Sequence, residues 1–147
     1  MMFLPDTHVF SAYLAGRSAS LTERIRSEFA AGTLRLSFMV VAELEFGAEK
    51  ARVQFGTTRF ARRVDTLRQQ LEIEPPGPEF PRCYAQVRSQ LEKVGRKMGD
   101  RDTIIAAHAL ALGAKYAAFI HAGAGFYGVR RAPKGFIGFL GPFFERE

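Results

Sequence analysis

The sequence predicts an α/β protein whose short parallel sheet is covered by helices on both faces. Apolar segments too short to be helices alternate along the chain with longer amphipathic segments of helical spacing. Strands separated by helices pair in parallel, because each helix carries the chain back to the same end of the sheet. With 147 residues, 47% of them hydrophobic, the chain is expected to form a single domain over residues 1–147.

The first half of the chain is expected to begin with a strand. Met1–Pro5 is apolar and is interpreted as a buried strand, and helical spacing follows from Val9 to Gly16. A second helix is predicted from about Ser18 to Ala31. Leu34–Ser37 is the next predicted strand, and a further helix begins near Met39.

The second half continues the same alternation. In chain order, its predicted elements are a helix over Phe60–Leu71, a strand over Leu71–Glu74, a helix from Phe80 to Gly95, a helix from Gly99 to Gly113 and a strand over Lys115–Ile120. Glycines and aromatic residues dominate the rest of the chain. Only a loop and an edge strand around Phe136–Leu140 are expected there.

The charge balance favours a polyanionic partner. Lys and Arg number 21 against 15 Asp and Glu, and a surplus of +6 on a small domain suits nucleic acid or an acidic protein. No apolar run reaches the roughly 18 residues of a membrane span, and the amino terminus lacks the basic start of a secretory signal. The single cysteine, Cys83, cannot form an internal disulfide, so a cytoplasmic location is expected.

Asp6, Asp100 and Asp102 stand at predicted helix starts. Asp6 follows the first strand, at the carboxyl edge where ligands collect in open parallel sheets. Helix capping is the alternative role for Asp6. In the helix behind Gly99, Asp100 as the cap and Asp102 in the first turn are likewise explained by the helix macrodipole.

Capping cannot explain Glu43. Its neighbours three and four positions away are apolar or lack a side chain: Met39, Val40, Phe46 and Gly47. The carboxylate is therefore predicted to face the core. A charge left alone there costs on the order of several kcal/mol, so an arginine or a cation is expected beside it.

If the sheet brings Asp6, Glu43 and Asp102 together, their like charges require a cation. Carboxylate oxygens suit Mg²⁺ or Mn²⁺. A divalent ion held in this way activates water and stabilises a pentacoordinate phosphate, which is the chemistry of many nucleases. The three acids are therefore the candidate metal-binding and catalytic residues.

A long interval of the chain is basic. Between Asp102 and Glu145 there is no Asp or Glu, and the candidate RNA-binding residues of this interval are Arg130, Arg131 and Lys134. Together with the overall surplus, this interval would attract a phosphodiester backbone toward the acidic centre.

The residues of the acidic centre also resemble three successive motifs of the PIN-domain family, and within it most closely those of VapC toxins of bacterial and archaeal toxin–antitoxin modules. The motifs, which span Met1 to about Lys115, are Asp6-Thr7-His8, Ala42-Glu43-Leu44 with Gly47, and Gly99-x-x-Asp102-x-x-Ile105-Ala106-Ala107-His108-Ala109. Each motif alone is weakly specific, but the three in order are strongly specific.

The resemblance implies a PIN-like three-layer α/β/α sandwich with a short, mostly parallel central sheet. It implies a Mg²⁺- or Mn²⁺-dependent endoribonuclease with metal ligands at Asp6, Glu43 and Asp102. Thr7 would bond near the metal, and Asp100 would be a cap or lie behind the ligands. It also implies a homodimer, inhibited by a cognate VapB-like antitoxin that inserts into the active-site groove.

The chain departs from the family pattern from about residue 116. Where the family places a fourth acid before a Phe, this chain has 121–125, His-Ala-Gly-Ala-Gly, before Phe126. Three explanations stay open: the site works with one well-held metal, Glu145 or Asp100 substitutes, or the tail has diverged and activity is reduced. A change of reading frame would also produce such a tail. His121 in a loop is most simply a solvated residue.

Two alternatives to a toxin ribonuclease follow. The missing acid favours a catalytically weakened or inactive PIN-like module that binds RNA or a protein partner. A Mg²⁺-dependent phosphohydrolase with Asp6 as nucleophile ranks last, because such enzymes usually carry Asp-x-Asp at this turn and His8 stands in place of the second Asp.

Overall fold

The computed structural model of the chain describes residues 2–93, 95, 97–113, 115–119 and 126–128. The helices of this part are α1 (Thr7–Leu14), α2 (Ala19–Ala30), α3 (Phe38–Phe55), α4 (Arg59–Gln70), α5 (Phe80–Lys93) and α6 (Asp100–Leu112). The strands are β1 (Phe3–Pro5), β2 (Leu36–Ser37), β3 (Ile73–Glu74), β4 (Lys115–Phe119) and β5 (Phe126–Gly128).

The strands are short and pair mostly in parallel. β1 pairs in parallel with β4, and β2 pairs in parallel with β3. The strands thus form a three-stranded sheet of order β1-β4-β5 and a two-stranded sheet of β2 and β3, and an isolated parallel bridge between Phe3 and Leu34, just before β2, links the two. β5 alone runs antiparallel, against β4. The carboxyl ends of β1, β2 and β3 therefore lie along one edge of the strands, where Asp6 follows β1, Pro75 follows β3 and Ser37 is the last residue of β2.

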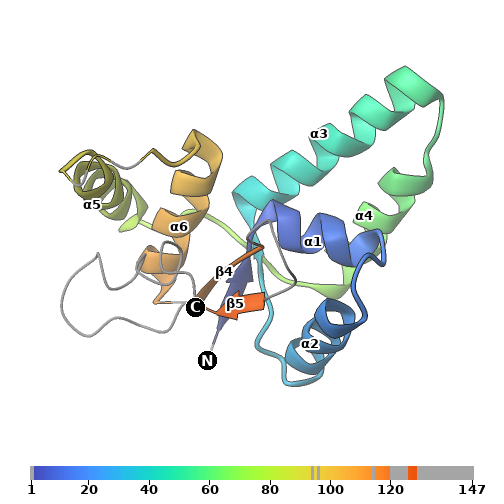
Figure 1. Cartoon of the computed structure of the whole chain (residues 1–147), viewed down its shortest axis with the longest axis horizontal. Coiled ribbons are helices and arrows are strands. Elements are labelled where there is room, and N and C mark those ends of the chain that lie inside the picture. The colour runs from blue at the N-terminus through green and yellow to red at the C-terminus, as the bar shows by residue number, and fades with distance from the viewer. Residues whose placement is uncertain (1, 94, 96, 114, 120–125, 129–147) are drawn as a thin grey trace.

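Helices cover the strands from two sides (Figure 1). α1 to α4 lie on one side, where α3 and α4 run beside each other as a hairpin, and α5 and α6 pack together on the other. This arrangement confirms the predicted three-layer α/β/α sandwich. The buried side chains between the layers include Leu4, Phe10, Ile25, Leu36, Leu44, Val64, Val87 and Ile105.

The predicted order of helices and strands is confirmed through β4, with boundaries shifted by a few residues. The exception is β5, because 126–128 was expected to be loop. An edge strand needs main-chain partners on one side only, which a Gly-rich segment with weak side-chain patterning can still supply. The predicted strand at Phe136–Leu140 lies outside the described residues. None of the described helices has the length and apolar character that a membrane span requires.

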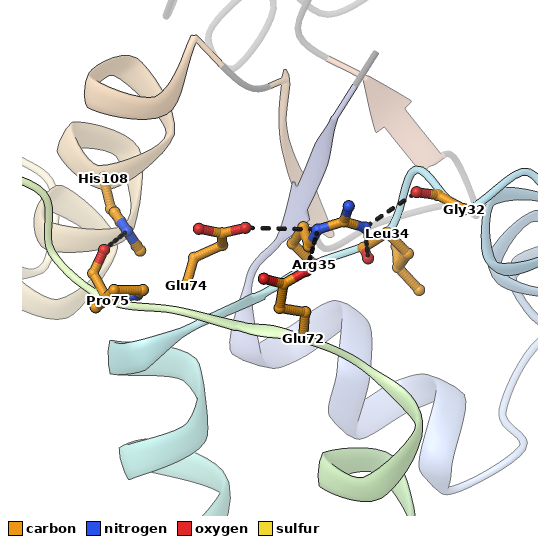
Figure 2. A network of polar contacts seen from close by, with 7 residues as sticks. All are labelled: Gly32, Leu34, Arg35, Glu72, Glu74, Pro75 and His108. Carbon is orange, nitrogen blue, oxygen red and sulfur yellow. Dashed lines mark hydrogen bonds and ion pairs between the residues drawn. The ribbon is translucent and has the colours of Figure 1, made fainter.

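Arg35 ties β2 to β3 at the edge of the sheet (Figure 2). Its Nη1 donates to the carbonyls of Gly32 and Leu34, at 3.0 and 2.9 Å. Its Nε lies 3.5 Å from Glu72 Oε2 and 3.4 Å from Glu74 Oε1. One guanidinium thus pairs with the acids on either side of Ile73, namely Glu72 just before β3 and Glu74 at its end.

His108 of α6 is fully buried and joins three segments of the chain. Its Nε2 lies 3.0 Å from the carbonyl oxygen of Pro75, just beyond β3 (Figure 2). A carbonyl only accepts, so Nε2 carries the proton and Nδ1 accepts from the Ser37 hydroxyl at 2.9 Å. Ser37 Oγ also accepts from the Met39 backbone N–H as the N-cap of α3. His108 therefore sets the position at which α3 begins relative to α6.

Aromatic rings enclose this histidine. The Phe38 ring meets it edge-on with centroids 5.0 Å apart, and the Phe80 ring does so at 6.1 Å. This burial lowers the pKa of His108, and the hydrogen bond to Pro75 acts in the opposite direction. His108 is therefore a neutral structural residue.

We expect His108→Ala to lose about 2–4 kcal/mol of the free energy of unfolding, through a cavity and two lost hydrogen bonds. The folded pKa of His108 lies below the unfolded value of 6.5. Its contribution is therefore present above pH 6.5 and is lost as the pH falls through the folded pKa. Urea denaturation between pH 7.5 and 5.5 should show a weaker loss of stability on acidification in the variant. An unchanged pH slope would contradict this role.

Candidate metal centre

Asp6 stands at the carboxyl end of β1 and is the N-cap of α1. Its side chain is buried, at 3% exposed, and Oδ1 accepts from the Val9 backbone N–H at 2.8 Å. The capping role considered for Asp6 is thus confirmed. A cap of this kind engages one carboxylate oxygen, so it is compatible with a second role at the same strand end.

Glu43 points inward from the second turn of α3, as predicted. Its side chain is only 12% exposed, beside the buried Val40 and Leu44. Thr7 Oγ1 at the start of α1 donates a hydrogen bond to Glu43 Oε2. Arg101 Nε of α6 lies 3.0 Å from Glu43 Oε1. The arginine expected beside this carboxylate is therefore Arg101, and both oxygens of Glu43 have partners.

Gly47 lies one turn beyond Glu43. A Cβ at this position would come 3.4 Å from the ring of Phe60 on α4. The small side of Gly47 therefore lets α3 pack closely against α4.

Asp102 lies in the first turn of α6 and is half-buried. The N-cap of this helix is Gly99, without a side-chain cap, so the prediction that Asp100 caps the helix is wrong. Asp102 Oδ2 comes within 3.5 Å of the place where a Cβ on Gly99 would lie, so the carboxylate folds back toward the helix start. It sits where the macrodipole favours negative charge.

Burial and three charged or ionisable neighbours act on the pKa of Asp102. Burial raises the pKa of Asp102 above its usual range, and the electrostatic interaction with His8 lowers it. Glu43 raises the pKa further by repulsion, and Arg101 lowers it. Glu43 and Asp102 are thus close enough for their charges to interact, although they are 59 positions apart in the sequence.

The structure brings two of the three candidate ligands, Glu43 and Asp102, close enough for their charges to interact. Asp6 directly precedes Thr7, whose hydroxyl bonds Glu43. Within the described part of the chain, no three His, Cys, Asp or Glu side chains are gathered closely enough to hold a metal ion. The described side chains therefore do not form a preassembled three-acid metal site.

Asp100 turns to a different surface. It is exposed and lines a hollow between α5 and α6 together with Arg88, Lys97 and Thr103. The candidate RNA-binding residues Arg130, Arg131 and Lys134 lie outside the described residues. So do residues 121–125, where the fourth acid of the family is missing, and Glu145.

Arg101 and His8 are site residues that the sequence patterns did not single out. Both stand beside candidate ligands in the chain, and a run of Asp-Arg-Asp or Asp-Thr-His does not show which way the basic side chain turns. The only available signal was the expectation that Glu43 needs a positive partner. Choosing that partner among 21 Lys and Arg residues required the packing of α3 against α6.

A protein family and several named proteins match most of the chain. Residues 3–131 match the PIN domain family. Ribonuclease VapC1 of Haemophilus influenzae (strain R2866) is 28% identical over 117 residues, covering 78% of this chain and 83% of the relative. Ribonuclease VapC2 of Rickettsia felis is 25% identical over 111 residues, covering 76% of this chain and 81% of the relative.

Solved structures share the fold. VapBC-1 from nontypeable Haemophilus influenzae matches with a TM-score of 0.62 at 26% identity, over 82% of this chain and 87% of that chain. VapBC2 from Rickettsia felis, bound to a DNA fragment from its promoter, matches with a TM-score of 0.71 over 79% of this chain and 85% of that chain. Its 24% identity bears on the fold alone. Since the family match spans residues 3–131 and includes all three acid-bearing motifs, the chain belongs to the PIN-domain family.

Proposed function

We propose that this protein is a metal-dependent endoribonuclease, the VapC-like toxin of a type II toxin–antitoxin module. The observation that carries the proposal is the charge interaction between Asp102 and Glu43, whose other partner is the Thr7 hydroxyl after β1, in a PIN-domain chain. The relatives named Ribonuclease VapC supply the reaction class, hydrolysis of RNA.

The donor set fits a hard divalent cation such as Mg²⁺ or Mn²⁺. The candidate ligands Asp6, Glu43 and Asp102, together with Thr7, offer carboxylate and hydroxyl oxygens, which are the ligands that such cations prefer. Glu43 and Asp102 repel each other, and a positive charge between them would relieve the repulsion. Asp6, Glu43 and Asp102 are the proposed ligands, with Thr7 orienting Glu43 through its hydroxyl.

Asp6, Glu43 and Asp102 would hold the ion, which would supply activation of water and stabilisation of the charge that develops on the phosphate. The protein contributes orientation. Thr7 holds one oxygen of Glu43, and the start of α6 holds Asp102. The basic surplus of the chain, with Arg130, Arg131 and Lys134 as proposed contacts, would draw the RNA backbone toward the acids.

The proposed partners follow from the relatives. A matched solved structure at 26% identity is VapBC-1 from nontypeable Haemophilus influenzae, which supports a cognate VapB-like antitoxin that blocks the site. We further propose a homodimer of single-domain chains spanning residues 1–147, acting on RNA in the cytoplasm. The missing fourth acid keeps a binding module without cleavage as the alternative. A phosphohydrolase with Asp6 as nucleophile is the further alternative, and His8 in place of a second Asp counts against it.

We expect the purified protein to cleave single-stranded RNA only with Mg²⁺ or Mn²⁺, and excess chelator to stop it. Glu43→Gln should lower the rate by about 100-fold or more, because loss of a ligand exceeds the 10–100-fold typical of supporting residues. Glu45→Gln is the matched control, since Glu45 lies outward on the same helix and pairs with Arg68. RNA binding without cleavage at any metal concentration would select the binding module.

Substitutions of Asp6 should separate capping from metal binding. Asn caps helices as well as Asp does, so Asp6→Asn should keep stability while losing cleavage. Asp6→Ala should lose cleavage and also about 1 kcal/mol of the free energy of unfolding. Denaturation curves and RNA cleavage of both variants give the comparison. A fully active Asp6→Asn, Asp102→Asn double variant would overturn the ribonuclease proposal.

Asp102→Asn should stabilise the protein in the absence of metal. Because the folded pKa of Asp102 is raised above the unfolded 3.8, the ionised carboxyl costs stability at neutral pH, and this cost disappears as the pH falls toward 3.8. A half-exposed group is screened, so we expect the melting temperature to rise by no more than about 3 °C at pH 7.5. Mn²⁺ should then raise the melting temperature of the wild type more than that of the variant. The reverse order would contradict the proposed ligand role.

A further inference from the structure

The ion pair between Arg101 and Glu43 is asymmetric. The Glu43 carboxylate is 12% exposed, whereas the Arg101 side chain is 64% exposed, and their atoms Oε1 and Nε are 3.0 Å apart. The Glu43 carboxylate is therefore held inside the protein, and Arg101 reaches it from the solvent-exposed side. Withdrawing Arg101 into solvent would uncover one oxygen of a carboxylate that Thr7 still holds by the other.

A second Arg–Glu pair on the same helix provides a comparison. Glu45 of α3 pairs with Arg68 of α4 at 2.7 Å, and both side chains are about equally exposed, at 41% and 43%. Such a pair is an ordinary surface contact. Only the Glu43 pair lies at the proposed metal centre, and only Glu43 shares its surroundings with a second interacting carboxylate, Asp102.

We infer that Arg101 is a displaceable counterion of the metal centre, which neutralises Glu43 until a divalent cation binds and is then released to contact the phosphate backbone of RNA. The inference rests on the proposed function and adds to it a residue that links metal binding to substrate binding. Glu43 Oε1 cannot serve as a metal ligand and retain Arg101 at 3.0 Å without placing two positive groups against each other.

The released side chain suits a phosphate. A guanidinium presents a rigid set of donors that matches phosphate oxygens, keeps its charge at all working pH values and is weakly hydrated. Arg101 already lies at the solvent side of the site and flanks Asp102 in the chain. Exchange of one carboxylate for one phosphate therefore requires rotation of a single exposed side chain and no movement of α6.

Metal binding in the absence of RNA tests the first half of the inference. Mn²⁺ is titrated into the full-length protein, and free Mn²⁺ is followed by electron paramagnetic resonance. We expect Arg101→Gln to tighten Mn²⁺ binding by about 3–10-fold, because a competing charge is removed at a partly solvated site. Arg101→Lys should stay near the wild type. Arg68→Gln, the matched control that breaks the exposed pair, should change the affinity less than about twofold.

A double-mutant cycle locates the competition. In the Glu43→Gln background, Arg101→Gln should no longer tighten Mn²⁺ binding, because the carboxylate for which the two cations compete is gone. Equal or weaker Mn²⁺ binding by the Arg101→Gln single variant, with thermal melting showing a folded protein, would overturn the inference. If the folded wild type binds no Mn²⁺, the proposed function fails first.

RNA binding tests the second half. A short single-stranded RNA oligonucleotide is titrated into the protein once with Ca²⁺ and once with chelator. Ca²⁺ is used because it binds oxygen ligands. Cleavage of the RNA is followed in parallel. In Ca²⁺, Arg101→Gln should bind RNA several-fold more weakly, with the slope of log affinity against log salt reduced by about 0.7. In chelator the two proteins should bind alike, since Glu43 then holds Arg101. Equal binding in both conditions would show that Arg101 does not contact RNA.

Discussion

An inward-facing carboxylate organises the candidate site. Glu43 points inward from α3, and its two oxygens are paired with a hydroxyl from α1 and a guanidinium from α6. A charge largely withdrawn from water is costly without such partners, so the position of Glu43 depends on the packing of these three helices. The same requirement gathers Thr7, Arg101 and Asp102 around one point at the end of β1.

Two contacts fix α6 against α3. Arg101 of the first turn reaches Glu43, and His108, two turns later, reaches Ser37 at the start of α3. The order of these pairs means that the helices run antiparallel where they touch. The inner contact is buried, neutral and fully hydrogen-bonded, whereas the outer one is charged and open to solvent. The buried His108–Ser37 hydrogen bond thus fixes the two helices, while the Arg101–Glu43 ion pair lies at the solvent-exposed side of the candidate site.

Much of the architecture was predictable because local patterns carry it. Apolar stretches at helical spacing, Gly113 in its left-handed conformation and Ser18 as the cap of α2 all act within a few residues of the chain. The inward direction of Glu43 was predictable for the same reason. β5 was not, because a strand at the sheet edge depends on pairing with β4 and leaves little periodicity in its own three residues. The N-cap at Gly99 was missed because Asp100 is of a residue type that is preferred at N-caps, whereas in the structure it is the first residue of the helix.

By itself, the sequence determined the alternation of strands and helices, the places of Asp6, Glu43 and Asp102 at element starts or on an inner face, and the need for a positive partner at Glu43. Only the tertiary structure decided that this partner is Arg101, that His8 approaches Asp102 and that Asp100 faces α5. Helical periodicity is a property of neighbouring residues, whereas the partner of a buried charge depends on which helices the sheet places side by side.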